Sequence, residues 1–419
     1  MKILVIGSGA REHAIAAAID SEGSHEVCVS PGNAGIAQTI NCVQTTSDAD
    51  LISIAKNFDL VVIGPEGPLA GGLVDRLKSS GATVFGPSQA AARIETSKHF
   101  AKEIMANANV RTAKSVLVNN VDDLSRALKA SSRPYVVKAD GIAAGKGAIV
   151  TGDRDAAYRH GSYWIRKGPV LLEEYVKGRE VSLFFLCDGR VLVPLSPAKD
   201  YKRLGESDTG PNTGGMGSHS PVTDLPANFV EEVQEAIAYP VIKQMAACGI
   251  VFRGLLYCGL ALCDDGPKVI EFNARFGDPE TQVILPRLTS SLSELLYATA
   301  KGDLRNISKP SFNNKAAVCV VIASGGYPEI PAGDTPIIGL NGTGDVQVLF
   351  AGARRNYPDE PDILHSHGGR IMNIVSLDKT FAKAREKAYR AVDQISITNK
   401  QFRRDIALEE EFMETNPLG

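Results

Sequence analysis

The chain has 419 residues, which indicates two to four domains at roughly 100–200 residues per domain. Its 44% hydrophobic and 22% charged residues are typical of a globular protein, and a net charge of −3 gives no basic field for nucleic acid or an anionic membrane. Seven scattered cysteines without a CxxC pair argue against a disulfide framework or a zinc site. No apolar run reaches the roughly 18–20 residues of a membrane span, and the N-terminal apolar stretch is too short for a signal peptide. We therefore expect a cytoplasmic enzyme.

The first hundred residues alternate short apolar strands with helical stretches, and Gly or Pro follows soon after each strand. The expected strands are 2–7, 25–30, 60–64 and 83–87, and the expected helices are 11–20, 49–57 and 71–80. Such alternation predicts a parallel, doubly wound sheet. The turns after the strands would line one edge, where sheets of this class bind ligands.

The pattern changes after residue 110, where strand-like segments with one helix near 121–131 predict a small lobe. Longer apolar strands follow at 181–189, 254–263 and 267–276, together with two helices at 228–248 and 292–300. A polar segment at 308–315 indicates a boundary before a further strand and a periodic helix at 381–395. We expect a multidomain α/β protein with an N-terminal Rossmann-like substrate domain, a small lobe, a large lobe and a mixed α/β C-terminal domain, at 1–109, 110–178, 179–309 and 310–419.

The segment "GSGAREH" at 7–13 follows a strand and opens a helix, as a dinucleotide-binding turn does. It departs from that fingerprint because Glu12 stands at the third glycine position, and because the second strand ends in Ser30 where NAD sites carry an acidic residue. A helix N-terminus still binds phosphate well. The alternatives are a phosphorylated substrate, which is favoured, a purely structural turn, and NAD.

The segment "KADGIAAGKGAIV" at 138–150 looks like a phosphate-binding P-loop but is not one. Only three residues separate Gly141 from Gly145, Gly147 follows Lys146 where a Ser or Thr is required, and a strand follows instead of a helix. We predict a hairpin-like flap whose backbone amides close over phosphate oxygens. Lys138, which ends the preceding strand, is either a fixed charge for a phosphate or a solvated lysine.

The strand "LLEEYV" at 171–176 places acidic side chains beside backbone groups that could pair with the edge of an adenine ring. A strand with a salt bridge is an equal alternative. The glycine-rich segment 208–221, "DTGPNTGGMGSHSP", suits a backbone wrapped around a ligand, with an ordinary surface loop as its alternative.

The segment "IEFNARFGDPETQ" at 270–282 gives the strongest chemical signal. Glu271 and Asn273 are two apart on an expected strand and therefore face the same side, and Arg275 continues the row. Carboxylate and amide oxygens are hard ligands for magnesium, and a guanidinium grips a phosphoryl group. A buried strand rarely carries three such groups on one face without a ligand.

Nine motifs stand in the order seen in the glycinamide ribonucleotide synthetase family of the ATP-grasp superfamily, and the chain resembles that family over nearly its whole length. The motifs are "GSGAREH", "PGNAG", "GPE-PL", "GPS", "ETSKHFAKEIM", "VVKADGIAAGKGAIV", "EEYVKGREVS", "DTGPNTGGMGSHSP" and "IEFNARFGDPETQ". The resemblance implies an N-terminal parallel-sheet domain, two lobes that grip ATP, and a C-terminal domain. It also implies a ligase of de novo purine synthesis that joins glycine to 5-phosphoribosylamine through glycyl phosphate, with ATP and Mg²⁺ or Mn²⁺. Its partners would be small molecules, and it would act as a monomer or weak homodimer without nucleic acid or membrane.

The resemblance also assigns residues by role. Phosphates and adenine of ATP would be held by Lys98, Lys138, the flap residues Gly145, Lys146 and Gly147, and the hinge residues Glu173, Glu174, Tyr175 and Val176, with Glu180 on the ribose. The metal would be held by Glu271 and Asn273, and Arg275, Lys138 and Asp278 would act at the reacting groups. Glycine would lie against Asn212, Thr213, Gly214, Gly215, Met216 and Gly217, and phosphoribosylamine against Gly9, Arg11, Glu12, His13 and Asn33. Alone, His13 would be a structural helix histidine.

The chain departs from the family pattern at two places. Many ATP-grasp enzymes carry another acidic metal ligand about 13 residues before the Glu271 equivalent, but Tyr257 and Cys258 stand there in this chain. The segment 151–168 is also shorter than the family leads us to expect, with room for a helix but not for a glycine-rich extension.

Other functions fit less well. Another ATP-grasp ligase of purine or carboxylase chemistry is disfavoured by "GPNTGGMG". An NAD-dependent dehydrogenase is opposed by Glu12 and Ser30, and a non-catalytic nucleotide-binding regulator by the intact Glu271–Asn273–Arg275 row.

Overall fold

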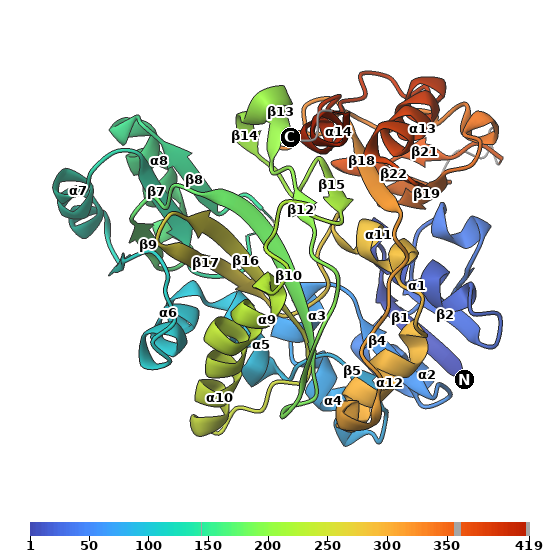
Figure 1. Ribbon diagram of the computed structural model, residues 1–419, viewed down its shortest axis with the longest axis horizontal. Helices are drawn as coiled ribbons and strands as arrows, with labels where there is room; N and C mark the ends of the chain where they lie inside the picture. Colours follow the sequence, from blue (N-terminus) through green and yellow to red (C-terminus); the bar gives the residue numbers. More distant parts are fainter. Residues whose placement is uncertain (144, 356–361, 416–419) are drawn as a thin grey trace.

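The computed structural model describes residues 1–143, 145–355 and 362–415, so that Ala144 of the predicted flap lies outside the described residues. In Figure 1 the N-terminal sheet lies at the lower right, the small lobe at the upper left and the C-terminal unit at the upper right, with the large lobe between them. In the part of the chain that is described, no helix is both long and apolar enough to span a membrane.

The N-terminal unit is a parallel sheet in the order β3-β2-β1-β4-β5, flanked by helices, as the sequence predicts. Its strands are β1 (Lys2–Gly7), β2 (Glu26–Pro31), β3 (Asn41–Cys42), β4 (Leu60–Ile63) and β5 (Val84–Phe85). Its helices are α1 (Ala10–Asp20), α2 (Asp48–Ala55), α3 (Glu66–Ala70), α4 (Leu73–Ser79) and α5 (Gln89–Thr96). The strand order reverses between β1 and β4, and the crevice at such a reversal is the usual ligand site.

The small lobe is an antiparallel sheet in the order β6-β9-β7-β8 with two helices packed on it. Its elements are β6 (Ser115–Val118), α7 (Val121–Ala130), β7 (Tyr135–Ala139), β8 (Ala148–Thr151), α8 (Arg154–Ile165) and β9 (Val170–Glu173), and α6 (Lys98–Asn107) leads into it. The helix α8 fills the short connection between β8 and β9. Gly161 lets α8 pack closely on α7, because a Cβ there would lie 2.6 Å from Leu124 Cδ2.

The large lobe is a four-stranded antiparallel sheet in the order β11-β10-β16-β17. The strands are β10 (Arg179–Cys187), β11 (Leu192–Pro194), β16 (Gly254–Cys263) and β17 (Gly266–Asn273), and the helices are α9 (Phe229–Val233), α10 (Tyr239–Ala247), α11 (Thr281–Ile284) and α12 (Leu292–Lys301). The single helix expected at 228–248 contains a π-turn at 234–238. This turn adjoins Pro240, which has no N–H to continue the α-helical ladder.

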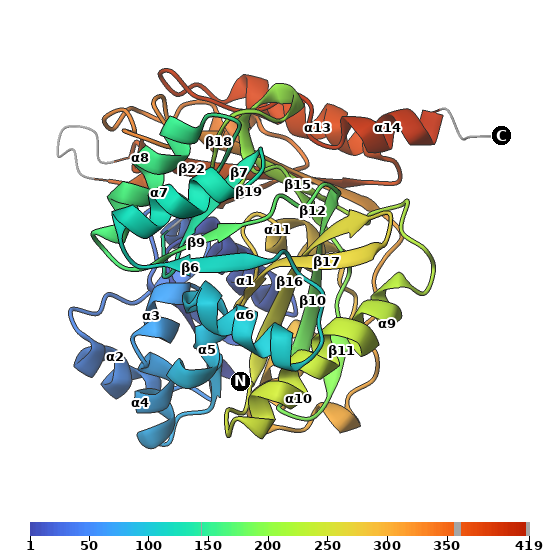
Figure 2. The ribbon, with the colours of Figure 1, turned by 90° about the vertical axis from the view of Figure 1, so that its left-hand side faces the viewer.

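The C-terminal sheet has the order β12-β15-β18-β22-β19, and its first two strands come from the middle of the chain. Its strands are β12 (Lys199–Asp200), β15 (Gly217–Ser220), β18 (Ala316–Ala323), β19 (Gln347–Phe350) and β22 (Arg370–Asp378). The helices α13 (Phe381–Gln394) and α14 (Leu408–Thr415) lie on the outside of this unit in Figure 2. Two hairpins complete it, β13 (Arg203–Gly205) with β14 (Thr209–Asn212) and β20 (Ala353–Arg354) with β21 (His365–Ser366).

Candidate active site

One face of the large-lobe sheet carries Glu271 and Asn273, which the sequence analysis singled out. Glu271 lies opposite Gly259 and Asn273 lies opposite Tyr257 in the pairing of β17 with β16. Directly opposed residues share a face, so Glu271 and Asn273 point to the same side, with Gly259 adding no side chain between the strands. Burial raises the pKa of Glu271, but Lys202, Lys138 and Lys98 oppose this effect and hold it below its usual value. Glu271 is therefore a carboxylate surrounded by cations.

Arg275 follows this row and is held by carboxylates of the N-terminal unit. Its guanidinium lies 3.0 Å from Glu95 Oε1 and 3.4 Å from Glu66 Oε2, and it donates to Asn273 Oδ1 at 3.5 Å. Glu66 Oε2 is also 3.9 Å from Arg11 Nη2. A single carboxylate therefore links the candidate phosphoryl-binding arginine to a candidate substrate-binding arginine.

The hinge residue Glu173 is buried, and its carboxylate is occupied by two lysines. Lys138 Nζ lies 2.8 Å from one oxygen and Lys102 Nζ lies 3.2 Å from the other. Lys138 also donates to the carbonyl of Ile270 at 3.2 Å, next to Glu271 in the chain. Both lysines would compete with adenine for the Glu173 carboxylate. In the structure, this carboxylate orients Lys138.

The other hinge residues follow β9. The N–H of Glu174 donates to the carbonyl of Lys114 at 2.9 Å, and Tyr175 is 49% exposed. Residues 174–177 line a shallow depression together with Thr112, Ala113 and the tip of the β16–β17 hairpin. Glu180 lies on β10, and its carboxylate is 2.8 Å from Lys202 Nζ.

The flap between β7 and β8 is anchored at its base and reaches a second glycine-rich segment with its tip. At the base, Asp140 accepts hydrogen bonds from Ser97 Oγ and from the N–H of His99, and Lys98 Nζ donates to the carbonyl of Gly141 at 3.4 Å. At the tip, Gly145 has a φ of +78°, and a Cβ there would lie 3.2 Å from the carbonyl oxygen of Thr213. Lys146 is exposed and Gly147 is buried.

The glycine-rich loop 212–217 is held from the C-terminal unit. Arg370 donates to the carbonyl of Gly214 at 2.6 Å and to Asp278, whose carboxylate lies 3.0 Å away. Tyr327 accepts from the N–H of Gly214 at 2.9 Å. A Cβ on Gly215 would lie 2.4 Å from Pro279 Cδ, so only glycine allows this approach. Met216 is fully buried and serves the core.

Glu12 lies in the crevice between β1 and β4, where its carboxylate has partners within the protein. It accepts from the N–H of Gly9 at 2.7 Å and from Arg11 Nε at 2.6 Å. A Cβ on Gly7 or Gly64 would collide with its side chain, so these two glycines make room for it. Glu12 therefore caps α1 and orients Arg11.

His13 and Asn33 join the N-terminal unit to β19. The N–H of Phe350 donates to His13 Nδ1 at 3.0 Å, and the two rings stack with centroids 6.1 Å apart. Burial lowers the pKa of His13 to about 4. Asn33 Nδ2 donates to the carbonyls of Ser8 and Phe350, at 2.8 and 3.2 Å. Both side chains bind groups within the protein. Their contacts with phosphoribosylamine stay a prediction.

Several residues of the site escaped the sequence analysis. These are Glu66, Glu95, Lys102, Lys202, Glu280, Tyr327 and Arg370. Glu66 stands in the quoted motif "GPE-PL", Glu95 and Lys102 stand in "ETSKHFAKEIM", and Glu280 stands in "IEFNARFGDPETQ", so the motifs contained the signal for four of them. Tyr257, in the region where a second acidic ligand was expected, instead donates to Glu280 at 2.7 Å.

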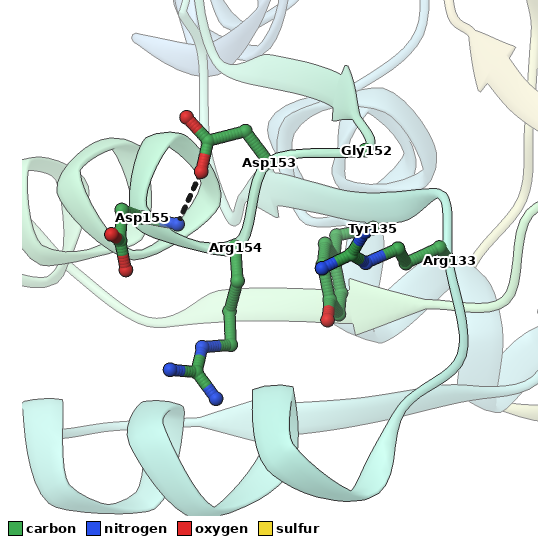
Figure 3. Close-up of a pocket in the computed structure, with 6 residues that line it drawn as sticks. All are labelled: Arg133, Tyr135, Gly152, Asp153, Arg154 and Asp155. Atoms are coloured by element: carbon green, nitrogen blue, oxygen red, sulfur yellow. Dashed lines mark hydrogen bonds between the residues drawn. The ribbon is translucent and has the colours of Figure 1, made fainter.

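A hollow at the edge of the small lobe is separate from this site (Figure 3). It is lined by Arg133, Tyr135 and residues 152–155, none of which the sequence predicts to be functional. Arg133 lies beside Tyr135, whereas Arg154 extends away from both. Asp153 caps α8 by accepting the N–H of Asp155 at 2.8 Å. The hollow lies at the N-terminal end of α8.

Comparison with known proteins matches most of the chain to one family. Three descriptions match in order: Phosphoribosylglycinamide synthetase, N domain, over residues 1–95; the ATP-grasp (A) domain over 96–281; and the C domain over 317–409. The phosphoribosylamine–glycine ligase of Leifsonia xyli subsp. xyli (strain CTCB07) is 49% identical, covering 97% of this chain and 99% of that protein. The ligase of Mycobacterium leprae (strain TN) is 45% identical, covering 97% of each.

Solved structures agree with this assignment. The phosphoribosylamine–glycine ligase from Thermotoga maritima has a TM-score of 0.84 at 33% identity, covering 97% of this chain and all 100% of that one. A biotin carboxylase from Campylobacter jejuni has a TM-score of 0.70 at 16% identity, covering 99% and 95%, and is a likeness of fold alone. The resemblance stated from the sequence motifs is confirmed, and the chain belongs to the phosphoribosylglycinamide synthetase family.

Proposed function

We propose that the protein is a phosphoribosylamine–glycine ligase. It joins glycine to 5-phosphoribosylamine in de novo purine biosynthesis and releases glycinamide ribonucleotide, ADP and phosphate. The observation that carries the proposal is the match of the N, ATP-grasp and C domains in order to one family, with full-length relatives of that activity. The proposal includes a cytoplasmic enzyme, in keeping with seven free cysteines, that acts as a monomer or weak homodimer.

ATP is used as the phosphoryl donor, as in other enzymes of this fold. We assign the phosphates to Lys98, Lys138 and the flap, and the adenine to the backbone of 173–176. The support is geometric: Lys138 is fixed by Glu173 beside the start of the Glu271 row, and Lys98 lies at the base of the flap. A fixed cation stabilises phosphoryl transfer more effectively than a mobile one because it needs no reorganisation.

The oxygen atoms of Glu271 and Asn273 suit a hard divalent cation, Mg²⁺ or Mn²⁺. Glu271 and Asn273 offer oxygen ligands on one face, and the cations around Glu271 keep its carboxylate ionised. Within the described residues, no group of three or more His, Cys, Asp or Glu side chains is arranged to hold a metal ion. One or two protein oxygens completed by substrate phosphates is the usual magnesium arrangement. When bound, the ion would neutralise phosphate charge.

The chemistry needs positioning and water exclusion more than a protein nucleophile. A glycine carboxylate oxygen attacks the γ-phosphorus, the bond to ADP breaks, and glycyl phosphate forms. The phosphoribosylamine nitrogen then attacks the acyl carbon, loses a proton, and phosphate leaves. Arg275 is assigned to the oxygens of the transferred group, because Glu95 and Glu66 hold its guanidinium beside Asn273.

Glycine is assigned to the loop 212–217 with Asp278, and phosphoribosylamine to the crevice near Gly9 and Arg11. The flap tip lies close to Thr213, because a Cβ on Gly145 would be 3.2 Å from the carbonyl oxygen of Thr213, so closure of the flap would seal the loop from water. Arg11 and Arg275 share Glu66, which supports adjacent sites for the two half-reactions.

The test is ADP release measured with both substrates, with glycine alone and with 5-phosphoribosylamine alone. Sustained turnover is expected only when both are present. ADP release at the same rate without glycine would refute the proposed ligase.

A further inference from the structure

Lys202 stands between two carboxylates of the proposed nucleotide and metal sites. It lies between β12 and β13, and its Nζ is 2.8 Å from Glu180 Oε2 and 3.9 Å from Glu271 Oε1. An ammonium group beside two carboxylates is positively charged at neutral pH, so Lys202 places a cation at this position.

The sheet leaves a space for this ammonium group. Glu180 on β10 is opposite Ala261 on β16, and Glu271 on β17 is opposite Gly259. Positions 259 and 261 are two apart on the central strand and share a face, so both carboxylates rise from that face on either side of β16. Only small residues lie beneath, and the lysine bridges the gap.

The central strand brings no acidic group to this face. Tyr257, which shares the face, is bound to Glu280 and to Ser182, whose oxygens lie 2.7 and 2.8 Å from its hydroxyl. Cys258 points to the opposite face and is buried. The charge opposite Glu271 is thus supplied by a lysine from outside the sheet.

The backbone of Lys202 is tied to the glycine-rich loop. Its carbonyl accepts the N–H of Thr213 at 2.7 Å and the Thr213 hydroxyl at 2.9 Å. Thr213 is the residue that the flap tip at Gly145 approaches. The ammonium is therefore held in place by the same turn that supports the loop.

We propose that Lys202 is a positioning residue whose ammonium restricts divalent-cation binding to the Glu271–Asn273 pair by occupying the space between Glu180 and Glu271. The inference rests on the proposed function, because it takes that pair as the metal site. Two facing carboxylates without a cation between them would form an oxygen-rich site for a further ion. A fixed positive charge neutralises one of them and repels a second ion. Glu180 pairs with Lys202 through Oε2 and would contact the ribose of the nucleotide through its other oxygen.

The test is direct titration of Mn²⁺ into the full-length protein without nucleotide, with free Mn²⁺ followed by electron paramagnetic resonance. Lys202→Met removes the charge and keeps most of the length of the side chain. It is expected to bind Mn²⁺ about tenfold or more tightly than the wild type, or to bind one ion more. Lys202→Arg should behave as the wild type because it keeps the charge. Lys309→Met is a matched control, since Lys309 pairs with Glu231 at the surface and is far from Lys202 in the sequence.

Unchanged affinity and stoichiometry in folded Lys202→Met would overturn the proposal. If that variant does not fold, Glu180→Gln provides the second measurement. It removes the charge of the carboxylate nearest Lys202, so that the lysine pairs more closely with Glu271 and should weaken Mn²⁺ binding. Unchanged or tighter binding would therefore also overturn the proposal. No turnover enters these titrations. A failure of glycine-dependent ADP release would therefore refute the proposed ligase, whereas an unchanged Mn²⁺ titration would refute the role of Lys202.

Discussion

The carboxylate of Glu95 binds both the side chain of Arg275 and the backbone N–H of the preceding residue, Ala274. One oxygen lies 3.0 Å from the guanidinium, and the other accepts the N–H of Ala274 at 2.7 Å. Glu95 belongs to α5 of the N-terminal unit, whereas Arg275 follows β17 of the large lobe. The position of the candidate phosphoryl-binding group is therefore set across two units of the fold.

Glu95→Gln should lower kcat by about tenfold or more, because the guanidinium loses a charged partner and shifts from its working position. The amide oxygen can still accept the N–H of Ala274, so the fold should be retained. The measurements are ADP release and thermal unfolding. Glu103→Gln on the adjacent helix is the control, as its side chain is 57% exposed. Equal kcat in Glu95→Gln and the control would contradict the assigned role.

Glu271→Gln should lower turnover by about 100-fold or more, since the site loses a charged oxygen ligand that is worth several kcal/mol in phosphoryl transfer. The side chain keeps its size, so the circular dichroism spectrum should not change. Mn²⁺ affinity measured without nucleotide should fall in parallel. A variant with normal activity would remove Glu271 from the metal site.

Gly145→Ala should impair the flap at its tip. The residue has a φ of +78°, and its Cβ would lie 3.2 Å from Thr213 O, so alanine is both strained and crowded. We expect lower kcat together with a larger fraction of ATP hydrolysed without ligation, measured as ADP released per glycinamide ribonucleotide formed. Gly152→Ala, with open space around its Cα, should leave that ratio at one. The same ratio in both variants would argue against closure of the flap on the loop.

Arg370→Lys tests the support of the glycine-rich loop. Arginine reaches the carbonyl of Gly214 and two oxygens of Asp278, at 2.6, 3.1 and 3.0 Å, whereas an ammonium cannot span these three acceptors in the same geometry. The KM for glycine should rise about tenfold, which corresponds to about 1.4 kcal/mol, with little change in the KM for ATP. A rise confined to the KM for ATP would place glycine elsewhere.

His13 gives the protein an acid-sensitive contact between α1 and β19. Its pKa is lowered to about 4 by burial, so the unfolded chain binds the proton first as the pH falls from 6.5. The stability due to neutral His13 is complete above pH 6.5 and is lost toward pH 4, with a limit of about 3 kcal/mol. Urea unfolding of the wild type and His13→Gln at pH 7.5 and pH 5 measures this. The wild type should lose more stability than the variant, and identical losses would contradict the prediction.

The sequence patterns predicted the helices and strands well, but they did not predict which distant residues contact one another in the site. The parallel sheet, the small lobe and the periodic helix at 381–395 follow from runs of apolar residues and their spacing, and the structure contains them. Glu271 and Asn273 share a face because the side-chain period of a strand is two. By contrast, Glu95 lies 179 residues from Ala274 and Arg370 lies 92 residues from Asp278. No sequence period records such contacts, which arise only when the units pack together.

Glu12 and His13 have internal partners that their motif does not predict. Both stand at the start of a helix that follows a strand, a position often used for phosphate, and their contacts with a substrate stay a prediction. In the structure, Glu12 fills the space left by Gly7 and Gly64, and His13 binds Phe350. The sequence could not reveal these contacts, because the space and the partner come from distant segments.

The strands β12 and β15 extend the C-terminal sheet from the middle of the chain, and this has a consequence for how the protein can be divided. A fragment that starts at the polar segment 308–315 would leave β18, all of whose residues are buried, with one edge unpaired. Such a fragment should aggregate. A fragment that ends at 308–315 lacks β18, the strand with which β15 pairs, so β12 and β15 would have no sheet to join. The loop 212–217 joins the same sheet through β15, so it is carried with the C-terminal unit, while the flap is carried with the small lobe. If the flap closes on this loop as proposed, opening of the site requires the small lobe and the C-terminal unit to move apart, and a crosslink between the two units should keep the flap closed.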